Sequence, residues 1–377
     1  MGSSSPTLPS RSETLDGILT LRQIDALVRD GVVTAERPLD PSQRQPTTLD
    51  LRVGTEALVL RSGFLPARGP VEELASHLVL ERLDLTAGAV LRKGRVHLVR
   101  LLEGLALPPQ IRARANPRSS TGRIDVFTRT VVDRHDRFDD IPAGYRGPLW
   151  LEIVPRSFDV RLATGHRLNQ VRFVSGRPLL TDIELAERVE RDDLVRPREG
   201  LLAVDGASLL LGLSLRPDRA GDPVGWRARL DAPVLDLCLP TGAHETRRFF
   251  DPIYPDARDG VVLEPEAFYI LASSERLRVP PDLAAEMLAW DVGMGELRTN
   301  YAGFFDPGFG WGPASPDGSR AVLEVRPHDV PLRVEHGQPI FRLQYSRTVE
   351  PCAVLYGGPG SAYQNQGLTL ARYFGRG

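Results

Sequence analysis

The feature that most constrains the fold is an internal similarity between the two halves of the 377-residue chain, which appears when the sequence is aligned with itself at an offset of 172. Residues 103–109 then match 275–281, and residues 151–155 match 323–327 in the same register. A repeat of this length predicts two copies of a whole domain, because solenoid repeats usually measure about 20 to 50 residues. A chain of this size can also bury two separate cores.

The same comparison indicates where the two domains divide. In each half, a strand pair bounded by turns follows the second match, at 159–173 and at 329–343, with the register changed by about two residues. A polar, charged stretch separates the halves at about 181–200. We therefore expect a disordered Ser/Pro-rich lead-in at residues 1–16, a first domain at 17–190 and a second domain at 191–377.

Turn-forming residues predict a mainly β fold with a few short helices. The 32 prolines and 35 glycines are spread along the chain and separate short apolar runs, which favours many turns over long helices. Alternating segments such as 48–54 and 96–101 are typical of strands. One helix is predicted near the start, where Thr20 and Gln23 can form a capping box and Gly31 can end the helix.

Composition excludes several classes of function. The formal net charge of −2 gives no overall field that would attract nucleic acid, so any anion site must be local. Cys238 and Cys352 have no second thiol or histidine at ligand spacing, which argues against a disulfide framework or a zinc site. No segment approaches the roughly 18 to 20 apolar residues of a membrane span, and the N-terminal segment lacks a signal-peptide pattern. We therefore expect a cytoplasmic protein that binds neither nucleic acid nor membranes.

The first half carries a compact anion-binding motif, Arg-Ser-Ser-Thr-Gly-Arg, at residues 118–123. The guanidinium groups of Arg118 and Arg123 offer forked donors for phosphate oxygens, and the hydroxyls of Ser119 and Ser120 can complete a cradle. The alternative is a polar surface turn with two solvated arginines. The second half has Trp-Asp-Val-Gly-Met-Gly at the corresponding place, so the fold itself does not require the cradle.

Glu152 is the candidate general base. It lies in an otherwise apolar segment, residues 148–154, where strand alternation places it on the same face as Trp150 and Val154. A carboxylate in a partly dry pocket suits proton transfer. The alternative is a structural glutamate paired with an arginine, because Glu324 occupies the equivalent place in the second half, where the cradle is absent.

The second half ends in a segment, residues 361–367, that has no counterpart after the last strand of the first half. The ring of Tyr363 and the amide of Gln366 suit a sugar or a phosphate better than a core. We therefore expect the first half to keep the reaction centre and the second half to contribute a tail that closes over it. Such a tail would be mobile without substrate, and deletion of residues 360–377 is expected to leave the thermal midpoint nearly unchanged.

Taken together, these motifs resemble the dCTP deaminase family, which shares its fold with the trimeric dUTPases. The resemblance extends over nearly the whole chain and is carried by residues 45–54, 107–108, 118–123, 144–152 and 363–366. It implies two tandem dUTPase-like β-barrel or jelly-roll domains, as in a long tandem form of the enzyme. It also implies dCTP as substrate, dTTP as a candidate feedback ligand, and a homo-oligomer with a trimer favoured.

Carried over position by position, the resemblance implies a set of site residues. It assigns activation of the attacking water to the glutamate, phosphate and reaction-centre contacts to the cradle, base recognition to the hairpin after the cradle, and closure to the tail. The residues are, for catalysis, Glu152, Ser119 and Arg123, and, for substrate binding, Arg118, Ser120, Arg123, Tyr363, Gln366, Val131 and Asp133.

The chain departs from the family pattern at three places. Asp125 replaces the glycine usual two positions after Arg123, and a charged insertion at 133–140 lengthens the hairpin expected to contact the base. Ala362 stands where the family often has a lysine, so one phosphate contact is expected to be missing or supplied by another residue. Residues 301–309 of the second half resemble the family hairpin more closely than the first half does, but without a cradle we interpret that second pocket as vestigial or structural.

The resemblance implies a metal-free deamination of dCTP to dUTP and ammonia that feeds dUTP and dTTP synthesis. The ligand signature of the zinc deaminases is absent, so Glu152 is expected to take a proton from a water near Ser119 and pass it to the departing ammonia. Mg²⁺ is expected to travel on the triphosphate oxygens, and no metal is expected on protein side chains. Two alternatives stay open: a dUTPase-like or bifunctional pyrophosphatase that uses Asp133 or Asp136, and a non-catalytic nucleotide sensor.

Overall fold

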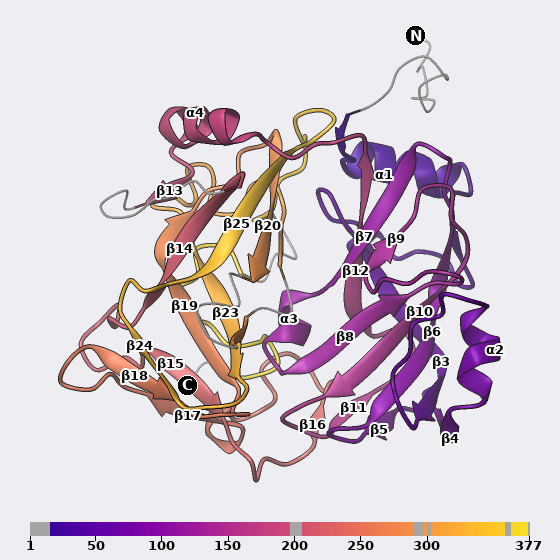
Figure 1. Cartoon of the computed structure of the whole chain (residues 1–377), viewed down its shortest axis with the longest axis horizontal. Helices are drawn as coiled ribbons and strands as arrows, with labels where there is room; N and C mark the ends of the chain where they lie inside the picture. The colour runs from indigo at the N-terminus through magenta and orange to yellow at the C-terminus, as the bar shows by residue number, and fades with distance from the viewer. Residues whose placement is uncertain (1–15, 197–205, 290–296, 300–302, 359–362, 376–377) are drawn as a thin grey trace.

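The computed structural model describes residues 16–196, 206–289, 297–299, 303–358 and 363–375. It contains two β domains in tandem, and the short helix α3 (Ser119–Gly122) lies between them (Figure 1). Several segments singled out in the sequence lie outside the described residues: most of the lead-in (1–15), the second-half counterpart of the cradle (290–295), the start of the second hairpin (301–302) and part of the tail (361–362).

The first domain consists mainly of antiparallel strands. Its elements are β1 (Gly17–Ile18), α1 (Leu21–Arg29), β2 (Val33–Ala35), a 3-10 turn (Pro41–Gln43), β3 (Leu49–Leu60), α2 (Val71–Ser76), β4 (Val79–Asp84), β5 (Ala89–Leu91), β6 (Val96–Ala106), β7 (Ile111–Pro117), α3, β8 (Val126–Val131), β9 (Asp140–Ile141), β10 (Arg146–Pro155), β11 (Val160–Leu162) and β12 (Arg167–Ser175). The sheet follows the order β8-β10-β6-β3-β12-β7-β9. The long strand β3 pairs with β12 near its start and with β6 further along, so it joins two faces of a barrel-like sheet.

The second domain repeats this arrangement. Its elements are α4 (Asp182–Asp192), β13 (Val195–Arg196), β14 (Ser208–Ser214), β15 (Gly225–Ala228), β16 (Leu235–Asp236), a 3-10 turn (Thr246–Arg248), β17 (Phe250–Ile253), β18 (Gly260–Leu263), β19 (Tyr269–Leu277), β20 (Leu283–Ala289), β21 (Leu297–Thr299), β22 (Phe304–Phe305), β23 (Ser319–Pro327), β24 (Leu332–Glu335) and β25 (Pro339–Arg347). Its strands are ordered β23-β19-β14-β25-β20-β22, which matches β10-β6-β3-β12-β7-β9. The expected mainly β class with two tandem domains is confirmed.

The structure refines the expected alignment of the two halves. β7 and β20 begin and end 172 residues apart, and so do β12 and β25. The expected register change of about two residues in this last pair is therefore wrong. Sequence matching was misleading there because the two strands share only an apolar pattern, whereas the hydrogen-bonded ladders retain the original offset.

The helix α4 corrects the expected domain division. A capping box at Thr181 and Glu184 begins this helix. Its buried residues Leu185 and Val189 belong to the second core, together with Leu180. The expected boundary after residue 190 would assign α4 to the first domain, but its apolar face is covered by the second.

Local signals account well for the first helix. Thr20 and Gln23 form the predicted capping box, in which each side chain bonds the backbone of the other. The helix ends at Arg29, and Gly31 follows with a left-handed φ of +70°, which glycine adopts without steric cost. None of the helices among the described residues is long and apolar enough to cross a membrane.

The larger hydrophobic core joins the two domains. It contains the inward-facing residues of the first barrel and also Phe249, Phe250 and Phe268 of the second half. The C-terminal residues Tyr373 and Phe374 are buried in the same core. Strand β16 also pairs in parallel with β11 of the first domain. The domains are therefore fixed against each other by a continuous core, and a site between them is held rigidly.

Candidate active site between the domains

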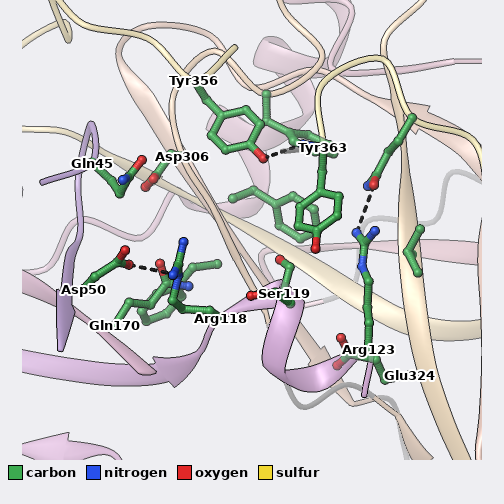
Figure 2. Close-up of a pocket in the computed structure, with 16 residues that line it drawn as sticks. Gln45, Asp50, Arg118, Ser119, Arg123, Gln170, Asp306, Glu324, Tyr356 and Tyr363 are labelled. Carbon is green, nitrogen blue, oxygen red and sulfur yellow. Dashed lines mark hydrogen bonds and ion pairs between the residues drawn. The ribbon is translucent and has the colours of Figure 1, made fainter. Parts of the chain in front are cut away.

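The cradle motif forms a short helical turn that faces the second domain. β7 ends at Pro117, Arg118 is extended (φ −71°, ψ 148°), and α3 follows over the next four residues. Arg118, Ser119, Ser120 and Arg123 line one cavity of about 90 Å³ (Figure 2). The sequence expected these four residues to act together, and the structure places them together.

Glu324 of the second domain completes the cradle. It lies on β23, where Leu323 and Val325 point into the second core while Val322 packs into the core shared with the first domain. Strand alternation therefore turns Glu324 toward α3. It is 2% exposed, and a Cβ added to Gly122 would lie 2.2 Å from its Oε1. Only a glycine at this position lets the carboxylate approach the cradle so closely.

A buried ion pair fixes the register between these two elements. Arg326, two residues after Glu324, forms an ion pair with Asp125, which also accepts a hydrogen bond of 2.5 Å from Ser157 Oγ. Asp125 has a left-handed φ of +55°, a conformation that Asp adopts more readily than most residues. This explains the departure at Asp125: the backbone that glycine usually provides is kept, and the carboxylate connects the two domains.

Arg123 occupies a buried end of the cavity. It is 3% exposed and donates hydrogen bonds of 2.9 Å to Gln366 Oε1 and to the backbone oxygen of Thr369. Its guanidinium stacks 3.9 Å from the ring centroid of Tyr363. Burial lowers the pKa of Arg123 from its usual value, and the nearby Tyr363 and Glu324 partly oppose this shift. The side chain stays a cation, because the ordinary arginine pKa is so high.

The opposite end of the cavity contains Arg118 and Asp50 (Figure 2). Arg118 Nε lies 3.2 Å from Asp50 Oδ1, and the carboxyl group is almost fully buried. Burial raises the pKa of Asp50 to about 6, although Arg118 and Arg167 act to lower it. Gln45 and Gln170 line the same end. The cavity thus has a cation next to a carboxylate at both ends.

A hairpin of the second domain forms another wall. Phe304, Phe305, Asp306 and Phe309 line the cavity. Residues of the first domain hold this hairpin in place: Arg172 donates to the backbone oxygen of Phe305 and to Asp306 Oδ1, at 3.2 and 3.3 Å.

Two further contacts secure the hairpin from the first domain. Asn116 Oδ1 accepts a hydrogen bond of 2.6 Å from the backbone N–H of Gly303, and Thr47 donates its hydroxyl hydrogen to Asp306. The guanidinium of Arg172 also lies 4.1 Å from the ring centroid of Phe304.

The C-terminal segment covers the cavity, but it is packed rather than loose. Tyr363 and Gln366 line the cavity and are 7% and 6% exposed. Gln366 Nε2 donates to the backbone oxygen of Arg320 at 2.9 Å, and Tyr356 Oη accepts from the backbone N–H of Tyr363 at 3.2 Å. Burial raises the pKa of Tyr356 to about 12. The expectation of a loosely attached tail is therefore wrong, since the described part of this segment is anchored by core contacts and hydrogen bonds.

Three expected site residues lie elsewhere. Glu152 shares a face of β10 with Trp150, which packs in a cluster beside α2, and its carboxylate pairs with Arg129. Val131 is buried in a small cluster beside α2, and Asp133 accepts a hydrogen bond of 2.8 Å from the backbone N–H of Val71. None of the three lines the cavity. The counterpart of Glu152 in the second half, Glu324, does line the cavity, and so does Phe305 on β22, the strand that corresponds to β9.

The sequence therefore selected the cradle and the tail that line this cavity, whereas Glu152, Val131 and Asp133 lie outside it. One sequence signal agrees with this arrangement: the second half has the hairpin that matches the family better, and the first half has the cradle. Asp50, Gln170 and Asp306 were not selected as site residues. Within the described part of the chain, no cluster of three or more His, Cys, Asp or Glu side chains could hold a metal ion.

Comparison with known proteins agrees with this geometry. The chain matches the family models of the N-terminal and C-terminal domains of 2′-deoxycytidine 5′-triphosphate deaminase, over residues 15–177 and 181–374. A dUMP-forming dCTP deaminase of Methanothermobacter thermautotrophicus is 30% identical over 139 residues, which are 36% of this chain and 67% of that protein. A dCTP deaminase of Halorubrum lacusprofundi is 28% identical over 155 residues, or 40% of this chain and 72% of that protein.

A solved structure extends the similarity to both domains. The crystal structure of 2′-deoxycytidine 5′-triphosphate deaminase from Agrobacterium tumefaciens has a TM-score of 0.83 to this chain at 42% sequence identity. The match covers 89% of this chain and 99% of that one. With both family models and a full-length structure matched, the chain belongs to the dCTP deaminase family, hydrolases that act on C–N bonds.

Proposed function

We propose that this protein deaminates dCTP in the cavity between its domains, with Glu324 as the general base. The observation that carries the proposal is the position of Glu324 against the Gly122 backbone, in a cavity that Ser119 and Arg123 also line. A buried carboxylate, a hydroxyl and a buried cation within one cavity are the groups that water activation requires. Residues of both halves of the chain line this cavity.

In the proposed reaction, a water held near Ser119 loses a proton to the carboxylate of Glu324. The resulting hydroxide attacks C4 of cytosine and forms a tetrahedral intermediate. Glu324 then passes the proton to the amino group, the C4–N bond breaks, and ammonia leaves, so that dCTP and water give dUTP and ammonia. The positive charge of Arg123 stabilises the negative charge that develops on the pyrimidine.

The remainder of the cavity is suited to the sugar and the phosphates. Arg118 and the hydroxyl of Ser120 provide donors for phosphate oxygens, and Asp306 provides an acceptor for a sugar hydroxyl. Mg²⁺ enters on the triphosphate as part of the substrate, because phosphate-bound Mg²⁺ keeps most of its water ligands and needs few from the protein.

The two equivalent glutamates provide a matched test. Glu324→Gln keeps the shape of the side chain but removes the base, so ammonia release from dCTP is expected to fall by about 10² or more. Glu152→Gln changes the same strand position in the first domain and should retain most of the activity, because Glu152 pairs with Arg129 outside the cavity. Ammonia release and thermal melting are measured for both variants.

Opposite results would reject the assignment. If folded Glu324→Gln releases ammonia at the wild-type rate, Glu324 is not the base. If Glu152→Gln loses activity without losing stability, the reaction centre lies in the first domain alone.

A second candidate function is deamination coupled to loss of pyrophosphate, which would yield dUMP. The relative from Methanothermobacter thermautotrophicus is named as dUMP-forming. In this chain Asp50 and Asp306 both line the cavity, and either carboxylate could align a water for attack on the α-phosphate. Asp133, the earlier candidate, does not line it. Incubation with dCTP followed by separation of dUTP, dUMP and pyrophosphate distinguishes the two reactions.

A further inference from the structure

A second and larger cavity adjoins the candidate active site. It measures about 760 Å³, within the range typical of small-molecule sites, whereas the cavity at Glu324 measures only about 90 Å³. Gln45, Arg118 and Tyr356 line both. Because the two cavities share Arg118, a substrate whose base lies at Glu324 can extend past Arg118 into the larger one.

The larger cavity is lined by cations. Its wall includes Arg44, Arg118, Arg167 and Arg372, together with His166, and its lining residues include no Asp or Glu. We call this cavity the arginine vestibule. Such a surface favours a ligand with several negative charges, because forked guanidinium groups match phosphate oxygens.

Carboxylates behind the wall neutralise only part of this charge. Arg44 pairs with Asp25 at 2.9 Å, and Arg167 lies 3.4 Å from Asp40. Asp50 is shared, since it lies 3.2 Å from Arg118 and 3.9 Å from Arg167. One buried carboxylate between two guanidinium groups leaves a surplus of positive charge in the vestibule.

Arg372 adds a cation on the opposite side. Its backbone is fixed, because its N–H donates to Tyr363 Oη at 3.3 Å and its carbonyl accepts from the backbone N–H of Gly242 at 3.0 Å. Its side chain is exposed and has no ion pair with any carboxylate among the described residues. It is nevertheless close enough to act electrostatically on Asp50. A fixed backbone with an unpaired guanidinium at the cavity wall is a suitable arrangement for holding an anion.

We propose that Arg167 and Arg372 bind the terminal phosphates of the nucleoside triphosphate, on the side of Arg118 away from Glu324. This inference rests on the proposed function. The base then lies at Glu324, the first phosphate passes Arg118, and the outer phosphates occupy the vestibule. Arg167 and Arg372 thereby select a triphosphate over a monophosphate, because a monophosphate ends before it reaches them.

The test compares dCTP with dCMP by calorimetric titration of full-length protein that carries Glu324→Gln, so that bound dCTP stays intact. Adding Arg372→Gln, or Arg167→Gln, is expected to weaken dCTP binding by about tenfold or more and to leave dCMP binding unchanged. Arg372→Lys keeps the charge without the fork and should bind dCTP with intermediate affinity. Arg82→Gln removes an equally charged, exposed residue outside the vestibule wall and should have no effect.

Three outcomes would overturn the proposal: unchanged dCTP affinity in both arginine variants, an equal loss for dCMP, or an equal loss from Arg82→Gln. Because Arg372 is exposed, its variant should fold even if Arg167→Gln does not, and melting curves verify this. Titration of the wild-type protein with inorganic tripolyphosphate distinguishes a failure of the vestibule proposal from a failure of the proposed deamination. If the wild-type protein binds tripolyphosphate and Arg372→Gln does not, the vestibule is supported even when dCTP releases no ammonia. If ammonia release is normal and dCTP affinity is unchanged in both arginine variants, only the vestibule is rejected.

Discussion

Asp50 is a buried carboxyl group under opposing influences. Burial, and to a smaller extent the charge of Asp306, raise its pKa to about 6, although Arg118 and Arg167 act to lower it. When ionised, it neutralises part of the charge of Arg118. A phosphate bound beside Arg118 brings a second negative charge close to this carboxylate and favours its protonated form. Ligand binding and protonation of Asp50 should therefore be coupled.

We expect dCTP binding to take up protons at pH values just above 6. The pKa of Asp50 is higher in the complex than in the free protein, so binding strengthens as the pH falls through the interval between the two values. Calorimetry at pH 7 in buffers of different ionisation enthalpy measures this uptake. The Asp50→Asn variant has no carboxyl group to titrate at this position. Its dCTP binding should therefore lack the proton uptake by Asp50 and keep only the proton uptake by the triphosphate itself. Equal proton uptake by the two proteins would show that Asp50 is not linked to binding.

At this scale, sequence could identify residue types but not their partners. The cradle and both glutamates stand out because polar groups interrupt apolar strands. Glu152 and Glu324 have nearly identical local sequences, and alternation predicts that each is on the opposite face from its apolar neighbours. The two glutamates differ in what packs against them: Arg129 pairs with Glu152, whereas the cradle of the first domain lies against Glu324. Neither partner is close in sequence.

At the scale of elements, the hairpin of the second domain depends on the first domain for its position. Arg172 on β12 is 3% exposed and bonds to the backbone oxygens of Ala285 and Phe305 and to Asp306. Loss of one partner from such a buried charged network leaves the others unsatisfied, which typically costs about 3 to 5 kcal/mol. Because Asp306 lines the cavity, the damage should reach the site.

We expect Arg172→Met to lower kcat/KM for dCTP by about 10², since small misplacements of substrate-positioning groups have effects of this size. Arg188→Met is a matched control: Arg188 forms a fork of two 2.8 Å bonds to Asp282 and does not line the cavity. Both variants should melt at lower temperature. At temperatures where both are folded, only Arg172→Met should lose activity, and Arg172→Lys should recover part of it. Equal kcat/KM losses in the two methionine variants would mean that Arg172 contributes only stability.

Elements with strong local signals were predictable. The capping box of α1 and the offset of 172 residues both follow from short-range patterns. The domain boundary at α4 was not predictable from the sequence. The apolar face of this helix could be covered by either domain, and only the packing shows that the second domain covers it. The register of β25 was predicted wrongly for a similar reason. It is set by hydrogen bonds to the neighbouring strands β14 and β20, which are distant in sequence.

At the scale of the whole molecule, the two similar domains contribute different parts of one site. The first supplies α3, Asp50 and Gln170, and the second supplies the hairpin, Glu324 and the C-terminal segment. Sequence comparison showed that cradle and tail are complementary between halves, and this asymmetry predicted a composite site. It could not show that the hairpin and the cavity glutamate, Glu324, also come from the second half, because that depends on how two similar barrels dock.

The C-terminal segment stabilises this docking, and this leads to a prediction opposite to the one from sequence alone. Tyr373 and Phe374 are each 6% exposed, and the ring of Phe374 lies 5.4 and 5.3 Å from those of Phe249 and Phe250. Deleting residues 363–377 should therefore lower the thermal midpoint by several degrees or more and abolish ammonia release. Removing a buried Phe alone typically costs about 3 to 5 kcal/mol.

Phe374→Ala separates the two roles of this segment. Phe374 does not line the cavity, so this variant should melt at a lower temperature but deaminate dCTP nearly normally while it is folded. The deletion also removes Tyr363 and Gln366, which contact Arg123, and should be inactive even at low temperature. Saturating dCTP should raise the midpoint of Phe374→Ala but not that of the deletion, because ligand stabilises only a protein that binds it. If the deletion melts like the wild-type protein, the segment does not hold the domains together.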